Sequence, residues 1–344
     1  MPRIRMALSA LTAIACYSSA AGAQAPPRPH APPASAGHSL VYADDLGMVL
    51  LVNAGLGSMT DPPASTPTRL WGWNGTGWLL LDSAGPPVRN LAGVAWDSRR
   101  HTLVMHGGTY DRDRSYDETW EWSRPSGWRR FVGAGPGLRD HTQMAYDPER
   151  GRAVLFGGSG NDPNTAFADT WEFDGTRWAW VATGGPPALV HHAMQYDPGL
   201  RRVLVFGGFT PGGRHLGDTW AWDGTRWTVM PPAAEPRTHG RMAFHRRFDA
   251  MLAVGNLRSA TLALVRGAAG WAPLSVAGGP SPRYLPDVAY DARRDVMVLF
   301  GGGDLASGAL LDDTWEFDGT TWRMIPAMAP AAPPDQLHDW PPPG

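Results

Sequence analysis

Residues 140–181, DHTQMAYDPERGRAVLFGGSGNDPNTAFADTWEFDGTRWAWV, decide the fold, because most of the chain is a variation on this stretch. An apolar segment at 141–146 precedes a turn that contains Pro and Gly, and a second apolar segment at 152–156 ends in a Gly-Gly pair. After a variable loop come residues 169–173, and an Asp-Gly hairpin signal leads into residues 177–181. The stretch therefore predicts four short antiparallel strands joined by tight turns.

The same pattern recurs along the whole chain. The apolar segment with its Gly-Gly ending occurs as LVMHGG, VLFGG, VLVFGG and MVLFGG, with degraded copies in LLVNAG and MLAVGN. Each unit closes on a tryptophan, and these tryptophans follow one another at intervals of 44 to 51 residues: Trp78, Trp128, Trp178, Trp227, Trp271 and Trp322. The spacing predicts six units, at residues 38–88, 89–138, 139–188, 189–236, 237–282 and 283–326.

The composition agrees with such a repeat. The chain has 344 residues, and its 42 Gly, 33 Pro and 17 Trp with only 18% charged residues favour many short strands over long amphipathic helices. All 30 basic residues are Arg, which excludes catalysis by a lysine Schiff base. The net charge of -2 gives no indication of nucleic-acid binding. Fourteen of the 17 Trp recur at third-strand or fourth-strand positions, which indicates packing between units rather than stacking on a glycan.

The Gly-Gly pair after an apolar strand, the aromatic residue before it and the later Trp resemble the kelch repeat. The resemblance covers residues 38–326 and implies an all-β, six-bladed kelch-type β-propeller with four antiparallel strands per blade, similar to the central domain of galactose oxidase. The unit at 237–282 departs most from the repeat, with AVGN in place of FGG. Kelch propellers often complete the last blade with a strand from the other end of the chain, whereas each unit here consists of consecutive residues.

The two ends of the chain differ from the repeats. Residues 1–23 have two Arg, an apolar run and a small-residue site, which predict a signal peptide and export to the periplasm or the cell exterior, without a membrane span. Alternatively, Cys16 belongs to a lipoprotein signal and carries a lipid anchor. Residues 24–37 are expected to be a Pro/Ala-rich linker, and residues 327–344 a Pro-rich tail.

Candidate binding residues lie in the linkers and in the loops between the second and third strands. In kelch propellers this shared face is the usual ligand side. The linkers place Arg89, Arg139, Arg237 and Arg283 at equivalent positions, and two residues later His38, His141, His191 and His239. A ring of Arg at the mouth would attract carboxylate or phosphate groups; alternatively, these Arg and His satisfy backbone carbonyls of the blades, as is common in kelch repeats. The variable loops add Tyr110, Phe167 and Phe209 as candidates.

The sequence assigns no catalytic residue, no metal ligand set and no cofactor. Each histidine comes from a different blade around a channel, which argues against a shared metal ion. Copper-radical oxidases of this fold need a Cys crosslinked to Tyr, and the single Cys is Cys16 in the signal segment. We expect a non-catalytic binding or scaffold module that recognises a protein or a glycan through the Arg/His-lined face. The alternative is a sugar epimerase or mutarotase that uses the same face, as in periplasmic kelch propellers that handle sialic acid.

Overall fold

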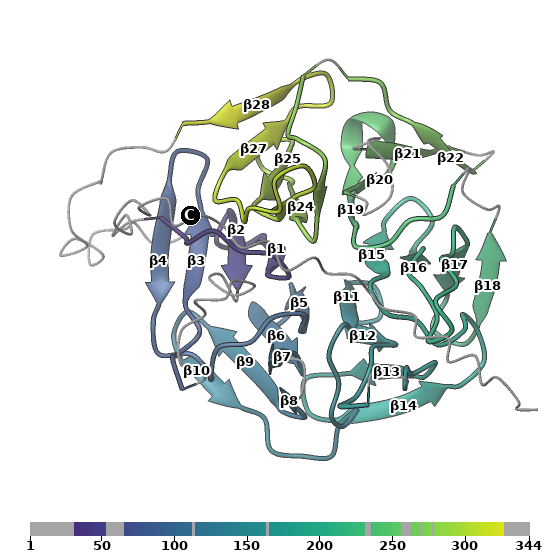
Figure 1. Cartoon of the computed structure of the whole chain (residues 1–344). Coiled ribbons are helices and arrows are strands. Elements are labelled where there is room, and N and C mark those ends of the chain that lie inside the picture. The colour runs from purple at the N-terminus through teal and green to yellow at the C-terminus, as the bar shows by residue number, and fades with distance from the viewer. Residues whose placement is uncertain are drawn as a thin grey trace, which may run out of the picture.

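The computed structural model describes residues 31–52, 65–111, 114–162, 165–230, 235–255, 263–267, 270–276 and 278–326. These residues form six four-stranded antiparallel sheets and two short two-stranded ribbons. The sheets surround a central axis, and the first strand of each sheet is the innermost (Figure 1). The predicted all-β propeller with four-stranded antiparallel blades is confirmed, and each sheet is called a blade below. The predicted signal peptide, Cys16 and the Pro-rich tail lie outside the described residues.

The strands follow the blades in chain order. Blade one consists of β1 (Ser39–Ala43), β2 (Met48–Val52), β3 (Leu70–Trp73) and β4 (Trp78–Asp82). Blade two consists of β5 (Gly93–Asp97), β6 (Thr102–His106), β9 (Thr119–Ser123) and β10 (Gly127–Arg130). Blade three consists of β11 (Gln143–Asp147), β12 (Arg152–Phe156), β13 (Thr170–Phe173) and β14 (Trp178–Ala182). Blade four consists of β15 (Ala193–Asp197), β16 (Arg202–Phe206), β17 (Thr219–Trp222) and β18 (Trp227–Met230). Blade five consists of β19 (Arg241–His245), β20 (Ala250–Val254), β21 (Ala263–Gly267) and β22 (Gly270–Pro273). Blade six consists of β24 (Asp287–Asp291), β25 (Val296–Phe300), β27 (Thr314–Phe317) and β28 (Trp322–Ile325). The ribbons are β7 (Thr109–Asp111) with β8 (Arg114–Ser115), and β23 (Arg283–Tyr284) with β26 (Gly303–Asp304); η1 (Arg246–Phe248) is a 3-10 turn between β19 and β20. Within the described residues, no helix has the length and apolar character needed to cross a membrane.

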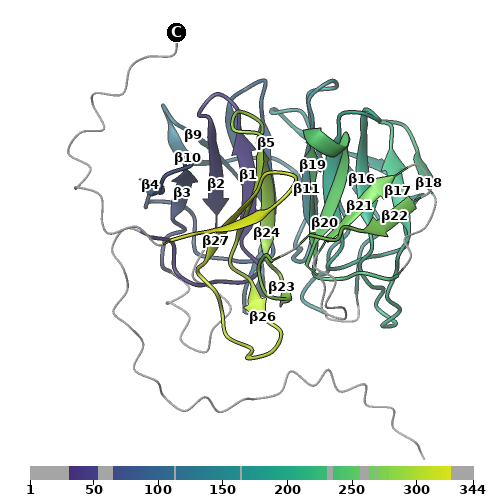
Figure 2. The same cartoon turned by 90° about the horizontal axis from the view of Figure 1, so that it is seen from above.

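The two ends of the ring carry different connections. The turns between first and second strands form one end, called here the turn face. The loops between second and third strands and the linkers between blades form the other end, the loop face, where Figure 2 shows β23 and β26.

In blades two, three, four and six, the Gly-Gly pair joins the blade to the one that follows it around the ring. Gly157 and Gly158 both have positive φ, at 66° and 94°, and the Gly158 N–H donates to the Leu189 carbonyl of the following linker at 2.9 Å. A Cβ on the equivalent Gly107 would lie 2.3 Å from the Arg139 carbonyl oxygen. Only glycine tolerates both the positive φ and this close approach, which explains why the pair recurs.

The ring closes by the same contact. The Gly302 N–H of blade six donates to the Ser35 carbonyl at 2.9 Å, and Ser35 N–H donates to Leu311 at 3.1 Å. β1 packs against β24, as neighbouring first strands do around the ring. The segment just before β1 therefore binds blade six, and among the described residues no strand is exchanged between the first and last blades.

The hydrophobic core lies between neighbouring blades, and buried tryptophan side chains make up much of it. Trp222 is fully buried, and its indole N–H donates to the Glu172 carboxylate of blade three at 2.8 Å. Trp73 makes the same bond to Glu316 of blade six at 2.8 Å. The Glu that recurs on the third strand therefore links neighbouring blades at these two sites.

The fourth-strand tryptophans add a second set of bonds between blades, which leads to a testable difference. Trp227 Nε1 donates to Thr170 Oγ1 of the preceding blade at 2.9 Å, whereas Trp128 Nε1 is buried with no hydrogen-bond partner among the described residues. We expect Trp227→Phe to lower the free energy of unfolding by about 1 to 2 kcal/mol more than Trp128→Phe, because only the first change leaves a buried hydroxyl unpaired. Urea unfolding of both variants measures this difference, and equal losses would contradict it.

Candidate functional site

A cavity of about 670 Å³ occupies the centre of the ring. It is lined by the first strands of all six blades and by the turns that follow them, from Ser39 to Asp44 in blade one and from Asp287 to Ala292 in blade six. The innermost strands leave this space because six blades of this width do not meet on the axis. The size is that of pockets that bind small molecules.

The linkers constrict the cavity at the loop face. Two residues before each first strand, the backbone takes a positive φ between 48° and 76°, at Gly37, Leu91, His141, His191, His239 and Leu285. We call these six residues the linker ring. Its backbone is hydrogen-bonded across blades: Leu91 donates to Gly37, Gly37 to Leu285, Leu285 to His239 and His239 to His191, at 2.8 to 3.2 Å. The Leu91 side chain lies over Gly37, where a Cβ would be 3.0 Å from Leu91 Cδ2. The cavity therefore opens toward the turn face.

The linker ring also corrects two sequence assignments. His141 was expected in a strand, but its φ of 51° is incompatible with one, and β11 begins two residues later. His38 was aligned with His141, but Gly37 takes that position, and His38 lies one residue further on, fully buried. There His38 Nε2 is 3.1 Å from the Phe300 carbonyl of blade six, so it belongs to the closure of the ring.

An aromatic residue lines the open end of the cavity in every blade. The fourth residue of each first strand is Tyr42, Trp96, Tyr146, Tyr196, Phe244 or Tyr290, and all six line the cavity. We call them the aromatic collar. Five of the six are half-buried and therefore keep part of the ring accessible, while Trp96 is buried and donates to Asp44 at 2.8 Å. Burial raises the pKa of Tyr196 to about 12, so its hydroxyl is a neutral hydrogen-bond donor at physiological pH.

The inner end of the cavity is polar and charged. Arg241 and Asp287, the first residues of β19 and β24, are both buried, with Arg241 Nε 3.7 Å from Asp287 Oδ1. Burial raises the pKa of Asp287 to about 6, against the opposing effect of Arg241 and of two backbone N–H groups. Between this inner end and the collar, Met144, Met194 and Met242 add apolar surface.

The four candidate arginines do not face the cavity. Arg89, Arg139, Arg237 and Arg283 are each at most 3% exposed, and each donates from Nη1 to the carbonyl of the first residue after the second strand of its own blade, at 2.9 to 3.3 Å. Arg139 also binds the Asp169 carboxylate at 3.0 and 3.1 Å, and Arg283 binds Asp313 in the same way at 2.7 and 3.1 Å. This geometry is that of the structural alternative, in which Arg satisfies backbone carbonyls.

The three linker-ring histidines lie together. The rings of His141 and His191 are 4.2 Å apart between centroids, and those of His191 and His239 are stacked at 3.7 Å. Phe209 stacks on His191 at 5.4 Å. Their blades therefore do not separate them, contrary to the argument made from the sequence, although no metal-ligand grouping among the described residues includes these three.

The remaining loop candidates are scattered. The Arg139 guanidinium carbon lies 4.5 Å from the centre of the Phe167 ring, so Phe167 covers a buried ion pair. Tyr110 is half-buried in the β7–β8 ribbon of blade two. The structure thus joins Phe209 to the histidines and leaves Phe167 and Tyr110 apart from them.

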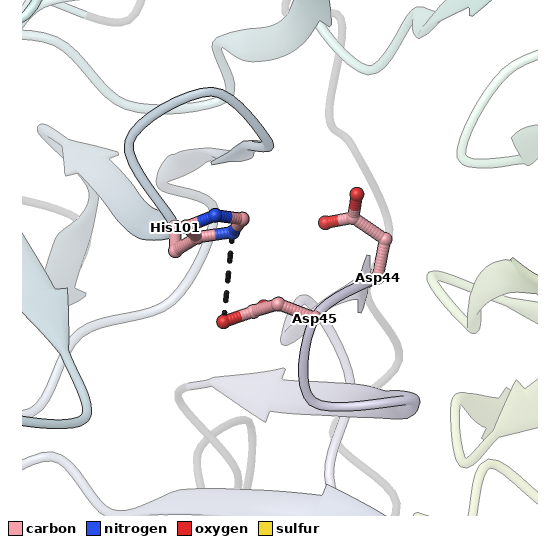
Figure 3. A group of neighbouring side chains, drawn as sticks. All are labelled: Asp44, Asp45 and His101. Carbon is pink, nitrogen blue, oxygen red and sulfur yellow. Dashed lines mark ion pairs between the residues drawn. The ribbon is translucent and has the colours of Figure 1, made fainter. Parts of the chain in front are cut away.

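A group of three exposed side chains lies at the turn face beside the collar. Asp44, Asp45 and His101 have ligand atoms within 4.8 Å of one another, and His101 Nδ1 is 3.6 Å from Asp45 Oδ2 (Figure 3). Asp44 is also the acceptor of the Trp96 indole bond. The group contributes negative charge at the edge of the cavity mouth.

Sequence reasoning missed the collar and the charged inner end. Both were visible in an alignment of the six units: one first-strand position is aromatic in every unit, and another reads Ser39, Gly93, Gln143, Ala193, Arg241 and Asp287. The second position has a different residue in every unit, so no repeat marks it.

Comparison with known proteins agrees with the fold. A solved structure titled "Structure of YjhT" superposes with a TM-score of 0.65, covering 86% of this chain and 99% of that chain at 12% sequence identity. The chain is a β-propeller. No protein-family model matches the sequence, and neither does any curated protein. At this identity the likeness to YjhT concerns the fold alone.

Proposed function

We propose that the protein is a binding module that holds a small carbohydrate in the central cavity, between the residues of the aromatic collar. The observation that carries the proposal is the coincidence of a cavity of about 670 Å³ with an aromatic ring from every blade at its open end. Sugars present flat apolar faces with polar edges, and aromatic side chains bind such faces while their own polar atoms remain hydrogen-bonded.

The chemistry of the walls favours this class of ligand. Tyrosine hydroxyls and turn carboxylates surround the mouth, methionines line the middle, and Gln143, Arg241 and Asp287 lie at the inner end. A purely apolar ligand would leave these polar groups unpaired on binding, at a cost of about 1 to 3 kcal/mol each. The loop face is the weaker candidate because its arginines are buried and hydrogen-bonded.

We also propose the type of propeller to which the chain belongs. The recurring Gly-Gly contact and six four-stranded sheets support a six-bladed propeller of the kelch type. The two Arg, the apolar run and the small-residue site within residues 1–23 support export, and we propose that the module acts in the periplasm or outside the cell.

Binding to a panel of soluble oligosaccharides tests the function. We expect Tyr196→Ala to weaken the affinity for any sugar that binds by about fivefold to tenfold, since one aromatic contact contributes about 1 kcal/mol. Trp180 on β14 is the matched control, because it is 59% exposed on the outer strand, away from the cavity, and Trp180→Ala should bind as the wild type does. Calorimetry of both variants decides the matter: loss of affinity in Trp180→Ala alone would place the site on the outside of the ring.

The alternative of a sugar epimerase or mutarotase has its own measurement. Asp287 lines the cavity and burial raises its pKa to about 6, but both its oxygens accept backbone N–H groups, from Leu40 at 2.8 Å and Val288 at 2.7 Å. We therefore expect no acceleration of proton exchange or anomeric exchange in a bound sugar, followed by NMR. Acceleration that is lost in Asp287→Asn would favour the enzyme.

A further inference from the structure

We propose that the closed end of the central cavity is an anion-binding subsite, in which Arg241 binds a carboxylate or a similar anionic group of the ligand. The inference rests on the proposed function for the nature of the rest of the ligand. It concerns a residue that the linker Arg and His candidates do not include.

Arg241 has unused hydrogen-bonding capacity. Its Nη1 donates to the Gly240 carbonyl at 3.1 Å, and no described residue accepts a hydrogen bond from its Nε or Nη2. The 3.7 Å separation from Asp287 Oδ1 is an ion pair without a hydrogen bond. By comparison, Arg139 and Arg283 each make at least two hydrogen bonds to a carboxylate. Of Arg139, Arg241 and Arg283, only Arg241 lines the cavity, and its Nε and Nη2 have no acceptor among the described residues.

Asp287 neutralises this charge incompletely. Its two oxygens already accept N–H groups from Leu40 and Val288, which hold the carboxylate on the backbone rather than on the guanidinium. Four histidines lie near Arg241: His38 and His192 are buried, and His191 and His239 are half-buried. Burial and the charge of Arg241 lower the pKa of all four, so they are neutral near pH 7 and add no further positive charge beside the guanidinium.

The location suits a ligand that enters from the collar. Arg241 and Tyr196 belong to neighbouring blades and line the same cavity, one at the inner end and one at the mouth. A sugar between the aromatic rings would therefore present its far end to the guanidinium. Bidentate hydrogen bonds to a carboxylate match the fork of an arginine, and they are strong where water is excluded.

Paired ligands test the subsite in the wild-type protein. Methyl glucuronide and methyl glucoside differ only in the carboxylate, and we expect the glucuronide to bind at least tenfold more tightly. In Arg241→Gln this preference should disappear while the affinity for the glucoside is retained. Arg246 is the matched control, because it lies exposed at the mouth of the same cavity, and Arg246→Gln should keep the preference.

A probe without a sugar ring separates the two proposals and does not depend on a variant. Crystals soaked in selenate should show anomalous scattering beside Arg241 Nε and Nη2. Equal affinity for both glycosides with no selenate at Arg241 would overturn the subsite, and the collar would stand if Tyr196→Ala weakens binding of the glucoside. Selenate at Arg241 with no binding of either glycoside would support the subsite and refute the carbohydrate.

Discussion

Replacing Arg139 by Met is expected to lower the free energy of unfolding by about 3 kcal/mol or more, with no effect on ligand affinity in the molecules that remain folded. The guanidinium is 1% exposed and bridges the Gly157 carbonyl and the Asp169 carboxylate. Its loss leaves the carbonyl unpaired and removes the counter-charge of the Asp169 carboxylate, which keeps only the Trp171 indole N–H among its side-chain donors. Breaking a buried ion pair from one side costs about 3 to 5 kcal/mol.

Arg177 provides the matched control for Arg139. It belongs to the same blade, but its side chain is 80% exposed and its nearest carboxylate, Asp174, is 3.7 Å away. Arg177→Met should change stability by less than about 0.5 kcal/mol, as for most surface ion pairs. Chemical unfolding compares the two. A stable Arg139→Met variant with weakened binding would restore Arg139 to the binding site, as the first of the two sequence interpretations had it.

Acidification is expected to unfold the protein near pH 5. Burial lowers the pKa of His38, His106, His192 and His239 to about 3, from an ordinary value of 6.5. In the window between these values the unfolded chain takes up a proton at each histidine and the folded chain does not. The stability is therefore fully present above pH 6.5 and is lost as the pH falls.

The size of this effect is comparable with the whole stability of a domain. At pH 5 each of the four histidines costs about 2 kcal/mol by linkage, or roughly 8 kcal/mol together. Asp287 acts in the opposite direction, because its raised pKa of about 6 favours the folded state as it protonates, by about 1 kcal/mol at pH 5. The remaining loss matches the 5 to 15 kcal/mol typical of folded domains.

His106 allows the acid effect to be tested at one site. Three other blades have Phe at this position, namely Phe156, Phe206 and Phe300, so His106→Phe has a precedent within the chain. The variant should lose its hydrogen bonds to Thr119 Oγ1 and to the Gly137 carbonyl but should lose about 2 kcal/mol less stability than the wild type between pH 7.5 and pH 5. Identical pH profiles for His106→Phe and wild type would contradict the account.

The repeat predicted the fold because its signals are local. Asp147 accepts the N–H groups of Glu149 and Arg150 at 3.1 Å, and Gly151 takes a φ of 67°, so five consecutive residues determine the turn. The Gly-Gly pair and the recurring tryptophans are likewise signals that can be recognised within a short stretch of sequence. Even the degraded fifth unit forms its blade, since β19 to β22 pair in order.

The site was harder to predict because it depends on which way each strand position faces. Arg139 and Arg241 are both linker-proximal arginines in the sequence, but one turns into its blade and the other lines the cavity. The choice depends on contacts across blades, such as the Asp287 carboxylate held by Leu40 N–H at 2.8 Å. The sequence does not display such contacts, and it directed attention to the loop face, where the linker ring constricts the channel.

A crystal structure of the protein with the carbohydrate that binds best in the panel tests the central claim most directly. The account predicts the sugar ring inside the channel at the turn face, in contact with collar residues such as Tyr146 and Tyr196. A sugar bound instead at the loop face, against His141 and Phe209, with the central cavity unoccupied, would contradict it.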